Sequence, residues 1–132
     1  MSKGRGTGPV HLSSIAEYWG GIPFRLAVAL DANTSTYQLF PGGAPFKCRV
    51  LGMSGIMTGA GASSDTIALQ DGDSNVIIAA VDVSALSDKD KWDASTVDDL
   101  YWDIDPGENL KVVSVSGALS YVFVELVNVE DL

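Results

Sequence analysis

Cysteine and histidine each occur once in this chain of 132 residues, and this scarcity excludes several kinds of site. Cys48 has no second cysteine with which to form an intrachain disulfide or a cysteine-rich zinc site. His11 cannot serve a site that needs two histidines. Long apolar runs are absent too: no stretch approaches the roughly 18 to 20 residues of a membrane-spanning helix, and residues 1–6 lack the apolar segment of a signal peptide. We therefore expect no membrane partner and no metal site of this kind.

Basic residues are also few, 8 against 17 acidic residues, which leaves a net charge of −9. Residues 1–64 hold five basic and two acidic residues, whereas residues 65–132 hold three basic and fifteen acidic ones. A nucleic-acid-binding protein needs a basic face to release counterions from phosphates, and here only the tip around Lys3 and Arg5 is basic. The composition predicts no nucleic-acid partner; an acidic surface keeps a protein soluble or steers it toward basic partners.

The first 20 residues differ in composition from the rest of the chain. Glycine at positions 4, 6 and 8, followed by Pro9, disfavours regular structure. The segment 11–19 fits a short helix that begins at a serine cap and ends at two glycines. We predict an N-terminal arm over residues 1–20 and a β-sandwich domain over residues 21–132, with a disordered terminus as the alternative for the arm. The apolar anchor of this arm would consist of Leu12, Ile15, Tyr18 and Trp19.

From residue 22 onward, apolar residues recur at period two, which is typical of half-buried strands. Glycine at positions 52 and 55 indicates a bulge or bend, and the acidic residues 84–99 indicate a long loop with room for one helical turn. Eight strands are expected, approximately at residues 22–30, 37–40, 46–57, 65–70, 76–83, 100–104, 110–115 and 121–129. We expect the last two to close the chain as a hairpin. This pattern predicts an all-β fold, an antiparallel, jelly-roll-like β-sandwich.

The last predicted strand is apolar on both faces. A two-layer sandwich of this size covers only one face of each sheet, so the second face must be covered by another chain or by the N-terminal arm. Both explanations stay open. One face holds Val122, Val124 and Leu126, and the other holds Tyr121, Phe123 and Val127, the residues expected at a subunit interface.

Two residues could act as a general base or a nucleophile, and the sequence argues against both. His11 lies in the glycine-rich arm, where rigid positioning of a base is hard to achieve. Cys48 alternates with Phe46 and Val50 on an apolar strand face, so we expect a buried thiol rather than a reactive thiolate. No glycine pattern of phosphate or dinucleotide binding is present. The sequence therefore predicts no catalytic residue, no cofactor and no enzyme activity.

The segment DGDSN at 71–75 resembles the start of a calcium-binding loop. Position six of that pattern is Val76 where glycine is required, and position twelve is Asp82 instead of glutamate. An Asp-Gly pair between two apolar runs predicts a hairpin turn instead. Whether Asp71 and Asp73 bind a cation stays open at this point.

Aromatic residues near acidic ones form one further candidate site. Trp92, Tyr101 and Trp102 could stack on a sugar, with Asp103 and its neighbours as hydrogen-bonding groups. They could equally form the core under the long loop, and carboxylates in such a stretch are more often solvated than catalytic. The sugar-binding interpretation supports an alternative function, a carbohydrate- or receptor-binding β-sandwich module.

Five segments of the predicted sandwich carry a resemblance: FKCRVLGM at 46–53, GAG at 59–61, DTIALQDG at 65–72, LKVV at 110–113 and YVFVEL at 121–126. They resemble the small β-sandwich virion proteins of tailed bacteriophages, in particular the capsid decoration (cement) proteins. In these proteins a proline-flanked strand enters a compact sandwich, a glycine- and serine-rich turn and a hairpin follow, and an aliphatic pair of strands closes the chain. The similarity covers approximately residues 22–129. With this resemblance, the alternative carbohydrate- or receptor-binding β-sandwich module would belong to a phage fibre or spike.

This resemblance implies a structural virion protein on the capsid surface, bound to the major capsid protein and assembled as a homo-oligomer, expected to be a trimer. It implies no catalytic residue, because the family has none. Symmetric assembly lets a small domain bury more apolar surface than it could alone. An arm that becomes ordered on docking adds contact area at an entropic cost.

Overall fold

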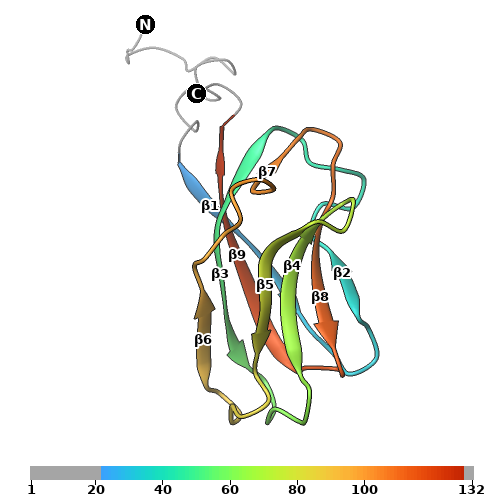
Figure 1. Cartoon of the computed structure of the whole chain (residues 1–132), viewed down its shortest axis with the longest axis vertical. Helices are drawn as coiled ribbons and strands as arrows, with labels where there is room; N and C mark the ends of the chain where they lie inside the picture. The colour runs from blue at the N-terminus through green and yellow to red at the C-terminus, as the bar shows by residue number, and fades with distance from the viewer. Residues whose placement is uncertain (1–21, 130–132) are drawn as a thin grey trace, which may run out of the picture.

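A computed structural model of the chain describes residues 22–129 and shows an all-β protein (Figure 1). These residues contain no helix that is long and apolar enough to cross a membrane. They form nine strands: β1 (Pro23–Ala29), β2 (Thr36–Gln38), β3 (Cys48–Met57), β4 (Thr66–Asp71), β5 (Val76–Asp82), β6 (Lys91–Ala94), β7 (Asp103–Ile104), β8 (Leu110–Val115) and β9 (Ser120–Asn128).

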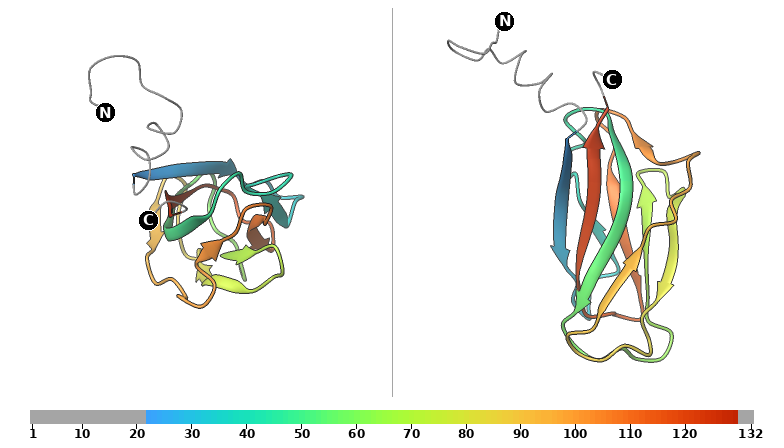
Figure 2. Two further views of the ribbon diagram at one scale, coloured as in Figure 1. Left: turned by 90° about the horizontal axis from the view of Figure 1, so that it is seen from above. Right: turned by 90° about the vertical axis from the view of Figure 1, so that its left-hand side faces the viewer.

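The strands form two antiparallel sheets that pack face to face (Figure 2). One sheet has the order β1-β9-β3-β6, with β7 also paired to β3, and the other has the order β2-β8-β4-β5. Neighbours within a sheet are mostly distant in sequence, as β1 and β9 are, so the chain repeatedly crosses from one sheet to the other. This is the predicted antiparallel β-sandwich.

The core lies between the sheets, and in strands such as β8 and β9 it is built from every second residue. On β9, Val122, Val124 and Leu126 point inward and have no exposed surface. Ile67 of β4 and Val112 of β8 meet them from the other sheet and are equally buried. Burial of these side chains stabilises the fold at about 25 cal/mol per Å² of apolar surface.

The long strand β3 contains the bulge that its glycines predicted. Its pairing with β9 runs in register from Cys48 to Val50, and shifts by one residue between Val50 and Gly52. The extra residue, Leu51, points outward and is 41% exposed. The bulge changes the alternation of β3, so that Met53 points inward after it.

Three details differ from the sequence-based expectation. Residues 91–94, expected in a loop, form the edge strand β6 because they pair with Met53–Ile56 of β3. The strand expected at 100–104 is reduced to the two residues of β7. The last two strands do not form a hairpin: β8 and β9 lie in different sheets, because the chain crosses between the sheets at residues 116–119, where Ser116 and Gly117 have positive φ.

Candidate functional site

The outward side of the sheet β1-β9-β3-β6 presents two aromatic residues, Tyr121 and Phe123, among aliphatic and charged side chains. We call it the Phe123 face. The register aligns outward residues of all four strands in rows across the sheet. One row holds Ala27, Phe123, Ser54 and Asp93, and the next holds Ala29, Tyr121, Ile56 and Lys91. The face is completed by Arg25, Glu125, Val127 and Leu51.

This face differs from the outward side of the other sheet. There, the strands present Thr36, Gln38, Thr66, Gln70 and Lys111 together with two valines, Val113 and Val115, whereas the Phe123 face carries aromatic rings. On the Phe123 face, Tyr121 is half exposed and Leu51 nearly so. An aromatic residue at the centre of an apolar patch with charged groups around it is the composition of a docking surface.

On the Phe123 face, Arg25 contacts both an aromatic ring and a carboxylate. The guanidinium of Arg25 lies over the Phe123 ring, 5.6 Å from its centroid, and 3.5 Å from the carboxylate of Glu125. Both charged side chains are about half exposed, so the ion pair itself adds little to stability. The ion pair instead helps to hold the guanidinium of Arg25 over the Phe123 ring.

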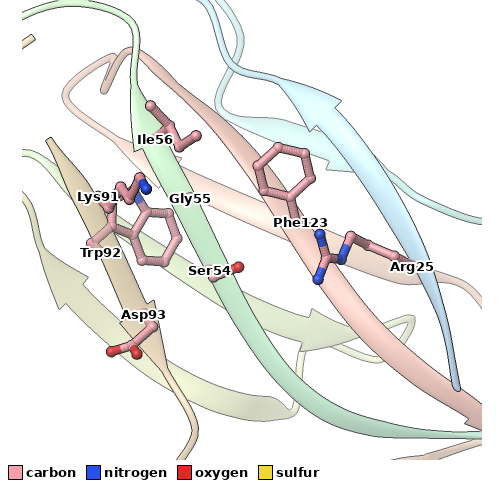
Figure 3. Close-up of a pocket in the computed structure, with 8 residues that line it drawn as sticks. All are labelled: Arg25, Ser54, Gly55, Ile56, Lys91, Trp92, Asp93 and Phe123. Atoms are coloured by element: carbon pink, nitrogen blue, oxygen red, sulfur yellow. The ribbon is translucent and has the colours of Figure 1, made fainter. Parts of the chain in front are cut away.

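A shallow trough runs along β3 beside Phe123 (Figure 3). Its larger part, about 440 Å³, lies between Phe123 on one side and Lys91 and Asp93 of β6 on the other, with Ser54 at its floor. A second hollow of about 240 Å³ continues it past Leu51. Small residues on β3 between larger neighbours create the trough, which can accept side chains of a partner.

Near the bulge, the face ends in a second cation–aromatic contact. Arg49 donates two hydrogen bonds to the carboxylate of Asp103, at 2.8 and 3.3 Å, and its guanidinium lies 4.7 Å from the centroid of the Trp102 ring. The hydrogen bond to Asp103 raises the pKa of Arg49. This arrangement fixes β7 to β3 and covers the Trp102 ring with a cation.

The structure brings together the three residues that the sequence predicts at a subunit interface. Tyr121, Phe123 and Val127 all point outward from β9 on the Phe123 face. Tyr121 is the most exposed of the three, and the other two are half-buried. The four predicted anchors of the arm, Leu12, Ile15, Tyr18 and Trp19, lie outside the described residues.

The three aromatic residues considered for sugar binding do not form an open platform. Trp92 is buried, and its indole Nε1 donates a hydrogen bond to Ser120 Oγ at 3.0 Å. The ring occupies space left free by Gly55, where a Cβ would lie 2.5 Å from it. Tyr101 and Trp102 are half-buried against the core. The alternative stated for these residues, a role in the core, is confirmed for Trp92.

The segment at 71–75 forms the β4–β5 hairpin turn. The Asp71 carboxylate accepts hydrogen bonds from the backbone N–H groups of Asp73 and Asn75, both at 2.9 Å, and from the Asn75 side chain at 3.0 Å. It is thus a turn-stabilising group with its oxygens occupied. Within residues 22–129, no cluster of three histidine, cysteine or acidic residues has the geometry to hold a metal ion.

Cys48 is fully buried on β3, as its position among apolar neighbours predicts. Burial, together with the charge of Asp103, raises the pKa of its thiol to about 12. A thiol of this kind is not a nucleophile near neutral pH.

Sequence analysis missed part of the Phe123 face. Leu51 and Ile56 lie on it because the bulge places residues of different parity on the same side, and the sequence shows only that a glycine marks the bulge. Lys91 and Asp93 border the trough through β6, which has too few apolar residues to be identified as a strand. The alternation of β1 could have identified Arg25 as outward-facing.

No family model matches the chain, and no curated protein matches it in sequence. Among solved structures, a chain of the cyanophage Pam1 capsid asymmetric unit has a similar fold, with a TM-score of 0.50 and 16% sequence identity over 97% of this chain and 96% of that chain. A chain in the structure of infectious bursal disease virus, Gt strain, matches less well, with a TM-score of 0.36 and 14% identity over 86% of this chain and 32% of that chain. The first likeness shows that the two chains share a fold along nearly their whole lengths.

Proposed function

We propose that the chain is a structural virion protein, a decoration or cement subunit that binds the outer surface of a tailed-phage capsid and stabilises the head. The observation that supports this most is the end-to-end likeness to a chain of the cyanophage capsid asymmetric unit. Because the likeness covers nearly all of both chains, the neighbour is also a small chain and not one domain of a much larger one. The small size of the chain is compatible with the proposed role, a separate protein that is added to an assembled shell.

The Phe123 face supports assembly with other copies. A sandwich of nine strands buries one side of each sheet, and the outward side of β9 still presents Tyr121, Phe123 and Val127. We propose that these residues form the subunit contact, in a trimer as the family resemblance implies. Packing one apolar face against another adds the buried area that a small domain cannot supply alone.

The N-terminal arm is the proposed contact with the major capsid protein, through Leu12, Ile15, Tyr18 and Trp19. A trimer would present three such arms to the shell at once. Once one arm is bound, the others bind as intramolecular events at high effective concentration, so weak individual contacts add up to stable attachment. Such attachment would cross-link neighbouring capsid subunits without catalysis or a cofactor.

The carbohydrate- or receptor-binding alternative has less support. Its aromatic platform requires an exposed indole, and Trp92 is buried with its Nε1 already hydrogen-bonded to Ser120. The capping of Trp102 by Arg49 also removes one ring face from contact with a ligand.

Density-gradient co-sedimentation tests the proposal. The protein is mixed with shells of the major capsid protein encoded in the same genome. The full chain should move with the shells at a fixed stoichiometry, and a chain lacking residues 1–20 should stay at the top of the gradient while keeping the melting temperature of its folded body. A full chain that remains unbound at saturating concentration would contradict the proposal, and retained binding by the shortened chain would refute the role of the arm.

A further inference from the structure

Among the described residues, the edge strand β1 differs from the three other edge strands of the two sheets, β2, β5 and β6. The edge strand β2 has three residues, and β6 has four with exposed Lys91 and Asp93. The edge strand β5 has seven, but two register shifts interrupt its pairing with β4. Short length, charge and bulges are the usual protections of an edge against pairing with another chain. The strand β1 has seven residues, no register shift and one charged residue, Arg25.

The backbone groups on this free edge can be assigned from the pairing with β9. Leu30 N–H donates to the Ser120 carbonyl at 2.8 Å, in the same register that pairs Val28 with Val122. Hydrogen-bonded and non-hydrogen-bonded pairs alternate along an antiparallel ladder. The even-numbered residues of β1 therefore bond to β9, and the N–H groups of Arg25, Ala27 and Ala29 point to the open edge. Pro23, which has no N–H, lies on the same side, as proline does at sheet edges.

The side chains beside this edge are incompletely buried. Phe24, Leu26 and Val28 point toward the core from β1 but are only half-buried, whereas their cross-strand partners on β9 have no exposed surface. Phe46 packs edge-on against Phe24, with ring centroids 5.8 Å apart, and is half-buried too. An apolar row next to free backbone donors is the combination that an added strand completes, because the strand satisfies the donors and covers the row.

We propose that β1 pairs antiparallel with β1 of a second copy of this chain, about a two-fold axis, to join the two sheets β1-β9-β3-β6 into one continuous sheet. A second copy fits because the edge is complementary to itself, as a two-fold contact requires. On the inner side of the joined sheet, the apolar residues Phe24, Leu26 and Val28 of one copy would meet the same apolar residues of the other. Outward, Arg25 meets alanine and not a second arginine.

The register centred on Leu26 uses every free donor of both strands. It places Arg25 opposite Ala27, so each donates its N–H to the carbonyl of the other. It places Ala29 opposite Pro23, so Ala29 donates to the Pro23 carbonyl, and no N–H is required from the proline. On the inner side, the two copies of Leu26 face each other in a close, non-hydrogen-bonded pair, and Phe24 faces Val28.

This contact is separate from the one proposed for Tyr121, Phe123 and Val127. It uses the edge of the sheet and not its outward side, so it goes beyond the proposed function and does not depend on it. In an assembly that has both contacts, the edge would link subunits of neighbouring oligomers.

Light scattering of two variants tests the proposal. The substitution Ala27→Pro removes a free-edge N–H without removing a bond to β9, whereas the matched control Ala27→Ser keeps that N–H. We expect the mass of Ala27→Pro to be half that of the wild type, and Ala27→Ser to keep the wild-type mass. An equal mass for all three proteins would overturn the proposal. The mass of Ala27→Pro also tests the proposed contact through the Phe123 face independently. If that contact forms the proposed trimer, the variant should have a mass near three times 13.9 kDa.

Hydrogen exchange on the wild-type protein gives a second test that needs no substitution. The amides of Arg25, Ala27 and Ala29 should be protected at high protein concentration and lose protection on dilution, while the amides of Leu26 and Val28 stay protected throughout. Rapid exchange at all concentrations would overturn the proposal. Protection that persists in a monomer would overturn it as well, because the edge would then be covered by residues 1–21 of the same chain.

Discussion

The guanidinium carbon of Arg25 lies 5.6 Å from the centroid of the Phe123 ring, at the centre of the outward side of one sheet. Glu125 holds the same guanidinium from the adjacent position on β9. The contact joins a half-buried aromatic ring to charged groups, so the Phe123 face can remain hydrated in a free subunit and still present apolar surface to a partner.

Tyr121→Ser should weaken self-association without unfolding the chain. Tyr121 is 50% exposed on the Phe123 face, and Val115 is equally exposed on the other sheet, which makes Val115→Ser the matched control. We expect the dissociation constant of the oligomer to rise at least ~10-fold for Tyr121→Ser, the effect of losing an aromatic contact worth about 1.4 kcal/mol or more. Analytical ultracentrifugation measures it. Equal weakening by Val115→Ser would show that the Phe123 face is not the contact.

Gly55→Ala should destabilise the sandwich by about 1–3 kcal/mol, the usual cost of overpacking. A Cβ at this position would lie 2.5 Å from the Trp92 ring and 2.5 Å from the Tyr121 carbonyl oxygen, so β3 or β6 would have to move. Gly52→Ala is the control, since its nearest neighbour would be 3.6 Å away. Urea denaturation compares the two. Equal midpoints for both variants would mean that Trp92 does not pack against Gly55.

Asp71→Ala should cost about 1–3 kcal/mol, because three donors of the β4–β5 turn lose their acceptor. The Asp73 side chain accepts none of these bonds, so Asp73→Ala should change the stability by less than about 0.5 kcal/mol. Thermal denaturation with and without calcium then distinguishes a hairpin turn at residues 71–75 from a calcium-binding site. We expect no shift with calcium, and a rise in melting temperature that Asp71→Ala abolishes would instead identify a calcium site.

Cys48 should make stability depend on pH above pH 9. Its folded-state pKa of about 12 lies above the ordinary value of 9.0, so between these values the unfolded chain releases a proton that the folded chain retains. Stability from this group is therefore complete below pH 9 and is lost as the pH rises toward 12. Urea midpoints at pH 8 and pH 10 should fall more for the wild type than for Cys48→Ala. The same fall in both proteins would show that the thiol does not titrate as described.

The sequence predicted β1 from its alternation, because a half-buried strand has an apolar residue at every second position. It predicted β9 from a long apolar run that follows a turn signal. It could not identify β6, since Lys91-Trp92-Asp93-Ala94 has two polar residues in four and becomes a strand only by pairing with β3. The expected final hairpin was wrong for a related reason. A short turn such as 116–119 can join two strands of one sheet or cross between sheets, and local sequence does not distinguish these outcomes.

The candidate site was predictable in its centre but not at its borders. Two-sided hydrophobicity of β9 identified Tyr121 and Phe123 directly. Leu51 depends on a bulge, and Asp93 depends on the pairing of an unpredicted strand, so both required the three-dimensional register. The burial of Trp92 likewise follows from the space that Gly55 leaves on the adjacent strand.

Electron cryomicroscopy of the capsid shells, reconstructed with and without the added protein, tests the central claim most directly. The account predicts additional density on the outer surface, large enough for this sandwich and repeated at equivalent junctions between capsid subunits. Shells that look identical in the two reconstructions, at protein concentrations that saturate any site, would contradict a decoration role.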